Sequence, residues 1–330
     1  MIDPKTNLSD DSAVLLMLCS HLGIGEADAA PLTLREWNTL ARKISDSEIK
    51  HPRGLLGMSG LHISQCLDMP ATEADRIAQL LTRGGSIALE LEQLSAAGIW
   101  CVTRADELYP TRIRDTLKHQ APPVLFGAGE ASILDRSAIG IVGSRNIDDA
   151  GADFARRLGE LCARSSVAVV SGGARGTDRI AMQGALDAGG FAVGILADSL
   201  TRTIRQPDVR NFIAEGHLIL LTPYRPDNGF SIGAAMGRNK VIYGASDFSV
   251  VVSSEVKKGG TWAGAIEELN AGWCPLFVRT AKNAGPGNEE LISRGGYAFS
   301  DAELEKIDDV FGWMKQNVVR QPAQEVLAFA

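Results

Sequence analysis

The sequence predicts an α/β protein, with a Rossmann-like, doubly wound and mostly parallel sheet preceded by a small all-helical domain. Between residues 137 and 279, short runs that are apolar on both faces alternate with helix-like segments. This is the pattern of a parallel sheet covered on both sides. Glycine-rich turns directly follow several of these runs, whereas the stretch before residue 84 carries helix signals only.

Composition places the chain among globular proteins. Its 330 residues are 45% hydrophobic and 22% charged, which indicates about two domains. The net charge of −7 excludes a protein that coats nucleic acid by bulk charge, but it allows a local cationic groove. No apolar stretch is long enough for a membrane span, and Met1 to Asp11 lack the features of a secretory signal. We therefore expect a cytoplasmic protein without membrane association.

The cysteines predict reduced thiols and no metal site. The five are widely scattered, without CxxC spacing and without a histidine at metal-ligand spacing. They are Cys19, Cys66, Cys101, Cys162 and Cys274.

Helix signals define an N-terminal domain over residues 1–85. Residues 12–20 form an apolar helical segment with an Asp/Ser start signal. Thr33 and Glu36 stand at capping-box spacing. Residues 71–82 carry apolar residues at helical spacing and end at Gly84-Gly85, which is a stop signal.

Extended segments define a Rossmann-like domain over residues 86–300. A helix over 87–97 precedes strand-like segments at 99–103 and 121–127. Six apolar runs then alternate with helices, and we expect strands at 138–142, 167–170, 191–196, 217–221, 248–252 and 275–278. Residues 301–317 predict one more helix, within a C-terminal helical tail over 301–330.

The turn at residues 171–178, Ser-Gly-Gly-Ala-Arg-Gly-Thr-Asp, gives the strongest functional signal. Its glycines let backbone N–H groups approach a ligand at the start of a helix, where phosphate groups bind well. Ser171 and Thr177 can donate hydroxyls, and Arg175 can form a bidentate contact with phosphate. The alternative is a turn that only connects strand to helix, for which one glycine would suffice.

Three further segments add glycines and cations. Gly143-Ser144-Arg145 follows the first parallel run, and residues 237–240 offer two cations and an amide. Residues 259–264 place glycines and Thr261 before another helix. Here Trp262 either stacks on a base or lies in the core. Glu267 and Glu268 either face solvent or take part in chemistry.

Candidate catalytic groups are few. None of the five histidines lies in a glycine turn, and no GxSxG elbow is present. The turn after the first strand is not GxGxxG and has no acidic residue at ribose-binding distance, which disfavours a nicotinamide cofactor. Hydroxyls, glycines, Arg and Lys are typical of binding to a nucleotide or an anionic polymer, and we expect a protein that is not an enzyme.

Several motifs occur together in an order that resembles the DNA-processing protein A (DprA/Smf) family. They are Leu108-Tyr-Pro110, residues 122–127, residues 141–145, residues 171–178, Gly184-Ala-Leu186, Arg238-Asn-Lys240 and residues 287–292. The similarity covers roughly residues 86–300. Lys240 stands where the family has a second arginine, and Met182 stands where it has a histidine, so the chain resembles a divergent member.

The resemblance implies a binding protein for single-stranded DNA that protects the strand and helps to load a RecA-type recombinase in DNA uptake, recombination or phage defence. It also implies a homodimer without a cofactor. By position, the resemblance makes the following residues DNA- or phosphate-binding: Gly143, Ser144, Arg145, Ser171, Gly172, Gly173, Arg175, Gly176, Arg238, Asn239 and Lys240. The glycine turns before two helices add Thr177, Gly260 and Thr261 to the predicted site. Bases would stack on Trp262 or Tyr224.

Two alternatives remain open. One is a nucleoside-monophosphate phosphoribohydrolase similar to the LOG proteins, with Glu267 or Glu268 as the acid and Arg145 on the phosphate. The other is a sensor of a small nucleotide.

Overall fold

The computed structural model describes residues 8–25 and 29–320. Parts of the polar N-terminal stretch (residues 1–7) and of the expected C-terminal tail (residues 321–330) lie outside the described residues. A nine-stranded sheet in the order β1-β2-β6-β5-β4-β3-β7-β8-β9 forms the centre of the molecule. The strands are β1 (Trp100–Thr103), β2 (Val124–Ala128), β3 (Ala138–Val142), β4 (Ala168–Ser171), β5 (Ala192–Ile195), β6 (Leu218–Thr222), β7 (Phe248–Val251), β8 (Leu276–Thr280) and β9 (Tyr297–Ser300).

The predicted α/β class and the mostly parallel sheet are confirmed. Strands β3 to β9 pair in parallel throughout, whereas β1 pairs antiparallel with β2 and β2 pairs antiparallel with β6. The six expected parallel runs are β3 to β8, and the two extended segments before them are β1 and β2. Strand β9 was not predicted, since it is short and only half-buried.

The sheet carries helices on both faces because its side chains alternate. Ile139 and Ile141 of β3 belong to one buried cluster, and Ala138 and Val142 belong to the other. The main helices are α1 (Asp10–Cys19), α2 (Leu34–Asp46), α3 (Gly60–Leu67), α4 (Ala71–Leu80), α5 (Gly84–Ala96), α6 (Thr111–Leu117), α7 (Asp149–Arg164), α8 (Thr177–Asp187), α9 (Leu200–Thr203), α10 (Pro207–Ala214), α11 (Ile232–Gly244), α12 (Gly259–Ala271), α13 (Pro286–Ser293), α14 (Asp301–Leu304) and α15 (Val310–Arg320). Helices α7, α8, α14 and α15 contribute to the first cluster, and α6, α11, α12 and α13 contribute to the second.

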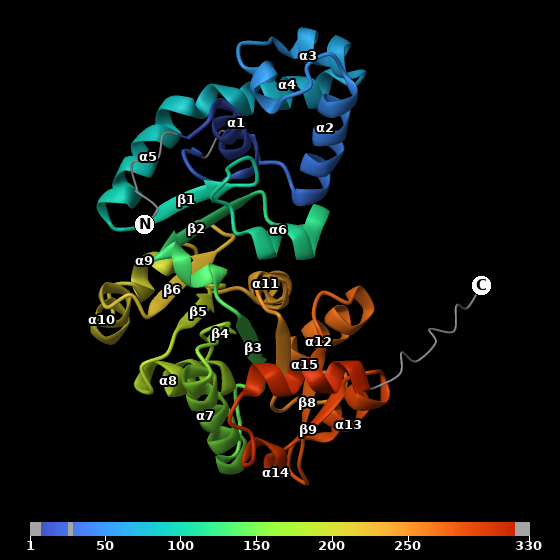
Figure 1. Ribbon diagram of the computed structural model, residues 1–330. Helices are drawn as coiled ribbons and strands as arrows, with labels where there is room; N and C mark the ends of the chain where they lie inside the picture. Colours follow the sequence, from blue (N-terminus) through green and yellow to red (C-terminus); the bar gives the residue numbers. More distant parts are fainter. Residues whose placement is uncertain (1–7, 26–28, 321–330) are drawn as a thin grey trace, which may run out of the picture.

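The N-terminal helices α1–α5 gather at the end of the sheet formed by β1 and β2 (Figure 1). The predicted capping box between Thr33 and Glu36 is present at the start of α2. Gly84-Gly85 does not end a helical region as expected. Both glycines have helical backbone and open α5, because a short 3₁₀ turn (Leu81–Arg83) links it directly to α4.

The C-terminal region also differs from the prediction. One helix was expected over residues 301–317, but α14 ends at Leu304 and α15 begins at Val310. A capping box of Ser300 and Glu303 starts α14, and the fully buried Arg279 of β8 binds Asp301 through two hydrogen bonds of 2.7 Å. These contacts hold the first turn against the sheet, so the chain must bend before α15 packs across α7.

The division into residues 1–85, 86–300 and 301–330 stays a prediction. One buried cluster contains residues of all three segments, including Leu16, Val250 and Met314. The cysteines are all unpaired, and no group of three or more His, Cys, Asp or Glu residues in the described chain could hold a metal ion. Among the described helices, none is both long and apolar enough to cross a bilayer.

Candidate functional site

The site lies where the strand order reverses. From β3 the chain runs to β4, β5 and β6 on one side and then crosses to β7 on the other. The crevice beyond the carboxyl ends of such strands is the usual ligand site of an open α/β sheet. A pocket of about 710 Å³ occupies this place and is called the switch pocket below. It is lined by residues 142–145, Ala174, Asp178, Phe230, Ile232, Ala235, Met236, Arg238, Asn239, Ile242, Tyr243, residues 253–255 and residues 257–263.

The segment Gly143-Ser144-Arg145 forms the floor of the switch pocket and is held from two sides. Thr177 of α8 donates its hydroxyl to the Ser144 carbonyl (3.1 Å), and Thr261 of α12 donates its hydroxyl to the Gly143 carbonyl (2.9 Å). The Thr177 side chain lies so close to Gly143 that a Cβ there would approach it to 2.4 Å. Tight packing therefore fixes the backbone that carries Arg145 into the pocket.

In the turn at residues 171–178, only Ala174 and Asp178 line the pocket, and the other residues support it. Ser171 is fully buried, and its hydroxyl donates to the Ile141 carbonyl at 2.5 Å. The Gly172 N–H donates to the Asp178 carboxylate (3.2 Å), which also accepts a bond from the Ala174 backbone. Asp178 thus takes up two N–H groups of the expected phosphate cradle, those of Gly172 and Ala174. A donor already bound to a carboxylate inside the protein is not available to an anion, so these two positions contribute no phosphate contact.

Arg175 also departs from the expected role. Its side chain is exposed, donates to the Asn146 amide oxygen (2.6 Å), and lies outside the lining of the switch pocket.

Arg238 of α11 is the buried cation of the site. Only 5% of it is exposed, and its Nε has no hydrogen-bond partner in the described chain. Burial lowers the pKa of this guanidinium, while the nearby Asp178 carboxylate acts in the opposite direction. A Cβ on Gly172 would collide with the guanidinium, so the glycine makes room for it. Because the Nε atom itself is inaccessible, the contribution of Arg238 to anion binding is its positive charge at the pocket lining.

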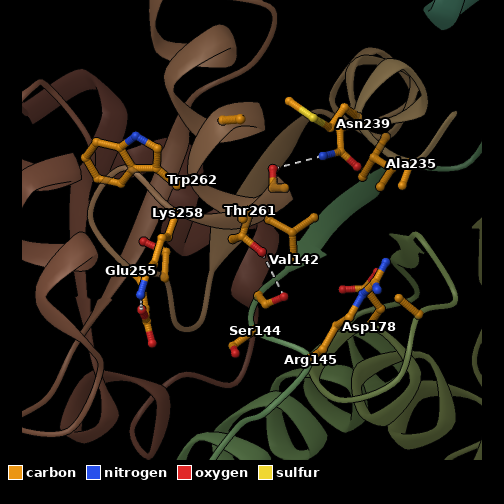
Figure 2. A pocket seen from close by; sticks show the side chains of 18 of the residues that line it. Val142, Ser144, Arg145, Asp178, Ala235, Asn239, Glu255, Lys258, Thr261 and Trp262 are labelled. Atoms are coloured by element: carbon orange, nitrogen blue, oxygen red, sulfur yellow. Dashed lines mark hydrogen bonds and ion pairs between the residues drawn. The ribbon is translucent and has the colours of Figure 1, made fainter. Parts of the chain in front are cut away.

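Arg145 and Asp178 face each other on one side of the switch pocket, and Lys258 and Glu255 lie on the other side (Figure 2). Burial raises the pKa of Asp178, and the charges of Arg238 and Arg145 oppose this effect. Four cations line the pocket against two carboxylates: Arg145, Arg238, Lys257 and Lys258 against Asp178 and Glu255. The excess of positive charge attracts an anionic ligand.

The mouth of the pocket is apolar. Phe230, Ile232 and Met236 are 50%, 74% and 46% exposed, although all three are large hydrophobic residues. We call these three residues the apolar rim. The Arg145 guanidinium lies over the Phe230 ring, 4.9 Å from its centroid. Sequence reasoning missed the rim; the signal available was an aromatic residue following the polar turn Pro-Asp-Asn-Gly.

The start of α12 forms the remaining wall. Lys258, its N-cap residue, makes no side-chain capping bond in the described structure, so the first N–H groups of α12 keep their donor capacity. Asn239 of α11 donates to the Gly260 carbonyl (3.0 Å) and ties the two helices together. Trp262 is only 8% exposed and packs in the second buried cluster, while it also contributes to the lining of the pocket.

Half of the predicted site residues meet at the switch pocket. Those that line it are Gly143, Ser144, Arg145, Arg238, Asn239, Gly260 and Thr261, and those that do not are Ser171, Gly172, Gly173, Arg175, Gly176, Thr177 and Lys240. Tyr224, the other suggested stacking residue, also lies outside the lining and donates its hydroxyl to the Ala234 carbonyl (2.9 Å). Asp178, Glu255 and the apolar rim are among the lining residues that were not predicted as site residues.

The residues proposed for hydrolysis are not in the pocket. Glu267 is exposed, and Glu268 is 1% exposed beneath the pocket with Oε1 accepting the Cys274 N–H (3.2 Å). Neither carboxylate lines the switch pocket, and no histidine or cysteine lines it. The hydrolase alternative therefore lacks its acid at the site, and the remaining groups are suited to binding.

Solved structures of similar fold confirm the architecture. DNA processing protein A from Streptococcus pneumoniae superposes with a TM-score of 0.59 at 18% identity, covering 83% of this chain and 98% of that one. The protein from Helicobacter pylori gives a TM-score of 0.53 at 23% identity, covering 66% of this chain and 97% of that one. At these identities the likeness establishes the fold.

Sequence relatives agree with the structural matches. DNA processing protein DprA of Bacillus subtilis is 27% identical over 212 residues, which cover 62% of this chain and 70% of that protein. Protein Smf of Escherichia coli is 27% identical over 235 residues, which cover 67% of this chain and 61% of that protein.

The family profile covers most of the chain. The profile described as DNA recombination-mediator protein A matches residues 100–309, from β1 to just before α15. Because this match spans the whole sheet, the switch pocket and more than half of the chain, the chain belongs to the DNA recombination-mediator protein A family.

Proposed function

We propose that this protein binds single-stranded DNA in the switch pocket. The observation that carries the proposal is that four cations, Arg238 among them, and an exposed apolar rim line the same pocket. The first feature suits a phosphate group, and the second suits nucleobases that are not stacked on one another.

Phosphate groups of the strand would contact the cations. Arg238 and Lys257 add positive charge to the pocket lining, and Arg145 lies across the pocket from Lys258. The uncapped N-terminus of α12 adds backbone N–H donors and the positive end of a helix dipole. These groups bind charge without regard to base identity, so we expect little sequence preference.

Bases would contact the apolar rim. The Phe230 ring is half exposed, and its face already carries the Arg145 guanidinium, so a base would stack beside an arginine–aromatic pair. A duplex keeps its bases paired and stacked inside the helix and cannot offer them to this rim. The geometry therefore favours a single strand over a duplex.

The relatives support this proposal. The B. subtilis relative is a DNA processing protein, and the H. pylori structure is described as showing a single-stranded DNA binding mode. The family description, a recombination mediator, supports the further proposal that the bound strand is protected and passed to a RecA-type recombinase. The same proposal includes the homodimer that the family resemblance implies. It also includes a cytoplasmic location, because DNA is the expected ligand. A small nucleotide as the ligand stays the alternative prediction.

The test is a salt titration of binding to fluorescent oligothymidine, with a duplex of equal length as control. We expect affinity to fall steeply with salt and the duplex to bind more weakly. Arg145→Ala should weaken binding about tenfold or more, because a charge-assisted contact contributes about 1.5–3 kcal/mol.

The matched control is Arg175→Ala, since Arg175 is also exposed but lies outside the switch pocket. Its affinity should stay within about twofold of wild type. Equal losses in both variants would contradict the pocket assignment, and tighter binding of the duplex would contradict the proposed function.

A further inference from the structure

The loop between β6 and α11, residues 223–231, carries Phe230 to the mouth of the switch pocket. We call it the rim loop. Although it serves the pocket, its first half is bound to the N-terminal helical region, which contributes no residue to the pocket lining.

Arg225 makes this connection. Its Nη1 donates to the His21 carbonyl (2.9 Å), its Nη2 pairs with the Glu90 carboxylate of α5 (2.8 Å), and its Nε donates to Asp227 (2.8 Å). The second oxygen of Glu90 accepts the Gly23 N–H at 2.7 Å. Both sides of the ion pair are mostly covered, with 30% and 21% of the two side chains exposed. Glu90 thus joins two segments of the helical region to one residue of the rim loop.

The rest of the rim loop has fewer attachments. The Pro226 carbonyl accepts the Thr201 N–H (3.0 Å), and the Asn228 N–H donates to the Arg225 carbonyl (3.0 Å). Beyond Asn228, the contacts that the described structure shows before α11 begins are the Arg145–Phe230 pair and the Ser231 cap of α11. The loop that carries Phe230 is thus held from both sides. Ser231 caps α11 and the Tyr224 hydroxyl donates to the Ala234 carbonyl of α11, whereas Arg225 is the attachment that reaches the helical region.

We propose that the Arg225–Glu90 pair is a brace through which the N-terminal helices position the rim loop. Resting on the proposed function, this means that α5 contributes to affinity for single-stranded DNA without touching the strand. Arg225 is a positioning residue here, since its donors are taken up by His21, Glu90 and Asp227.

A direct DNA contact by Arg225 would predict the opposite change in DNA affinity when Glu90 is substituted. If Arg225 contacted DNA directly, removal of the Glu90 charge would release a cation and strengthen binding. If the pair is a brace, the same change loosens the loop and weakens binding. Glu90→Gln tests this, because glutamine keeps an oxygen for the Gly23 N–H while losing the charge.

The experiment compares Glu90→Gln with Asp227→Asn in the full chain. Asp227 is the matched control, because it also pairs with Arg225 but belongs to the rim loop itself. The first readout is the rate at which chymotrypsin cuts after Phe230, which requires no DNA. The second is affinity for oligothymidine, and thermal unfolding reports on the whole fold.

For Glu90→Gln we expect cleavage about threefold faster or more and binding about three- to tenfold weaker, with the melting temperature nearly unchanged. Asp227→Asn should leave cleavage and affinity within about twofold of wild type. In a double-mutant cycle, Arg225→Gln combined with Glu90→Gln should be no worse than Arg225→Gln alone, because Arg225→Gln already removes the contact to Glu90.

An unchanged cleavage rate in Glu90→Gln would overturn the brace, and so would unchanged or tighter DNA binding in a protein that binds single strands. Failure of the proposed function is distinguishable: wild type would then not bind oligothymidine, while faster cleavage in Glu90→Gln would still support the brace as a property of the loop.

Discussion

Two glycine turns at the same edge of the sheet have similar sequence patterns, but their hydrogen bonding differs in the structure. We call the turn at residues 171–178 closed, because Asp178 accepts N–H groups of Gly172 and Ala174. We call the turn before α12 open, because the described structure shows no such carboxylate bond to its N–H groups. The N-cap residues do not make the difference, since Gly176 before α8 and Lys258 before α12 both lack a side-chain capping bond. Both contain glycines ahead of a helix, so glycine alone does not indicate an anion site. What matters is whether a neighbouring side chain already accepts the N–H groups.

Two buried carboxylates also differ in whether their oxygens have hydrogen-bond partners. Asp178 accepts backbone N–H groups and lies near Arg238, whereas Glu268 has a buried Oε2 without a partner in the described chain. The first stabilises a turn and a cation, and the second is desolvated with little compensation. Substitutions at these two positions should therefore have opposite signs.

The largest effect is expected for Asp178→Ala. The change removes the acceptor of the closed turn and leaves the buried Arg238 without its nearby counter-charge, which should lower the free energy of unfolding by about 3–5 kcal/mol. Denaturant titration measures this loss. Asp178→Asn, which keeps an acceptor oxygen, should lose less, and a stable Asp178→Ala protein would show that the turn does not depend on its own carboxylate.

The next effect concerns Glu268 and pH. Burial raises the pKa of Glu268 from 4.5 to about 7. Stability from the protonated carboxyl is fully present below about pH 4.5 and is lost as pH rises through about 7, amounting to about 3 kcal/mol. Denaturant titrations at about pH 5 and about pH 8 should show this loss in wild type and not in Glu268→Gln. An identical pH dependence in both proteins would mean that Glu268 is ionised without penalty.

The smallest effect is expected at the open turn. Lys258 is exposed and lines the switch pocket at the start of α12, so Lys258→Ala should weaken oligothymidine binding modestly. Its clearer signature is a salt dependence with a slope lower by about 0.7, the value for one phosphate contact on a single strand. A slope equal to that of wild type would place the strand away from α12 and would favour the closed turn after all.

The sequence predicted well what depends on local pattern. Runs such as 138–142 and 248–252 are apolar on both faces, and they form β3 and β7 at the centre of the sheet. Thr33 and Glu36 predicted their capping box from spacing alone. Predictions were wrong where a distant contact decides, as at Asp301, where a buried arginine from β8 holds the first turn of α14.

The candidate site shows the same division. Glycine turns after apolar runs predicted the edge of the sheet at which the switch pocket lies, because parallel strands must bring their carboxyl ends to one edge. Which turn stays open, which arginine is buried and unsatisfied, and how Phe230 reaches the pocket were decided only when α8, α11, α12 and α5 packed together. The physical reason is that hydrogen-bond satisfaction and desolvation are properties of a group's neighbours in space, and those neighbours come from segments far apart in the chain.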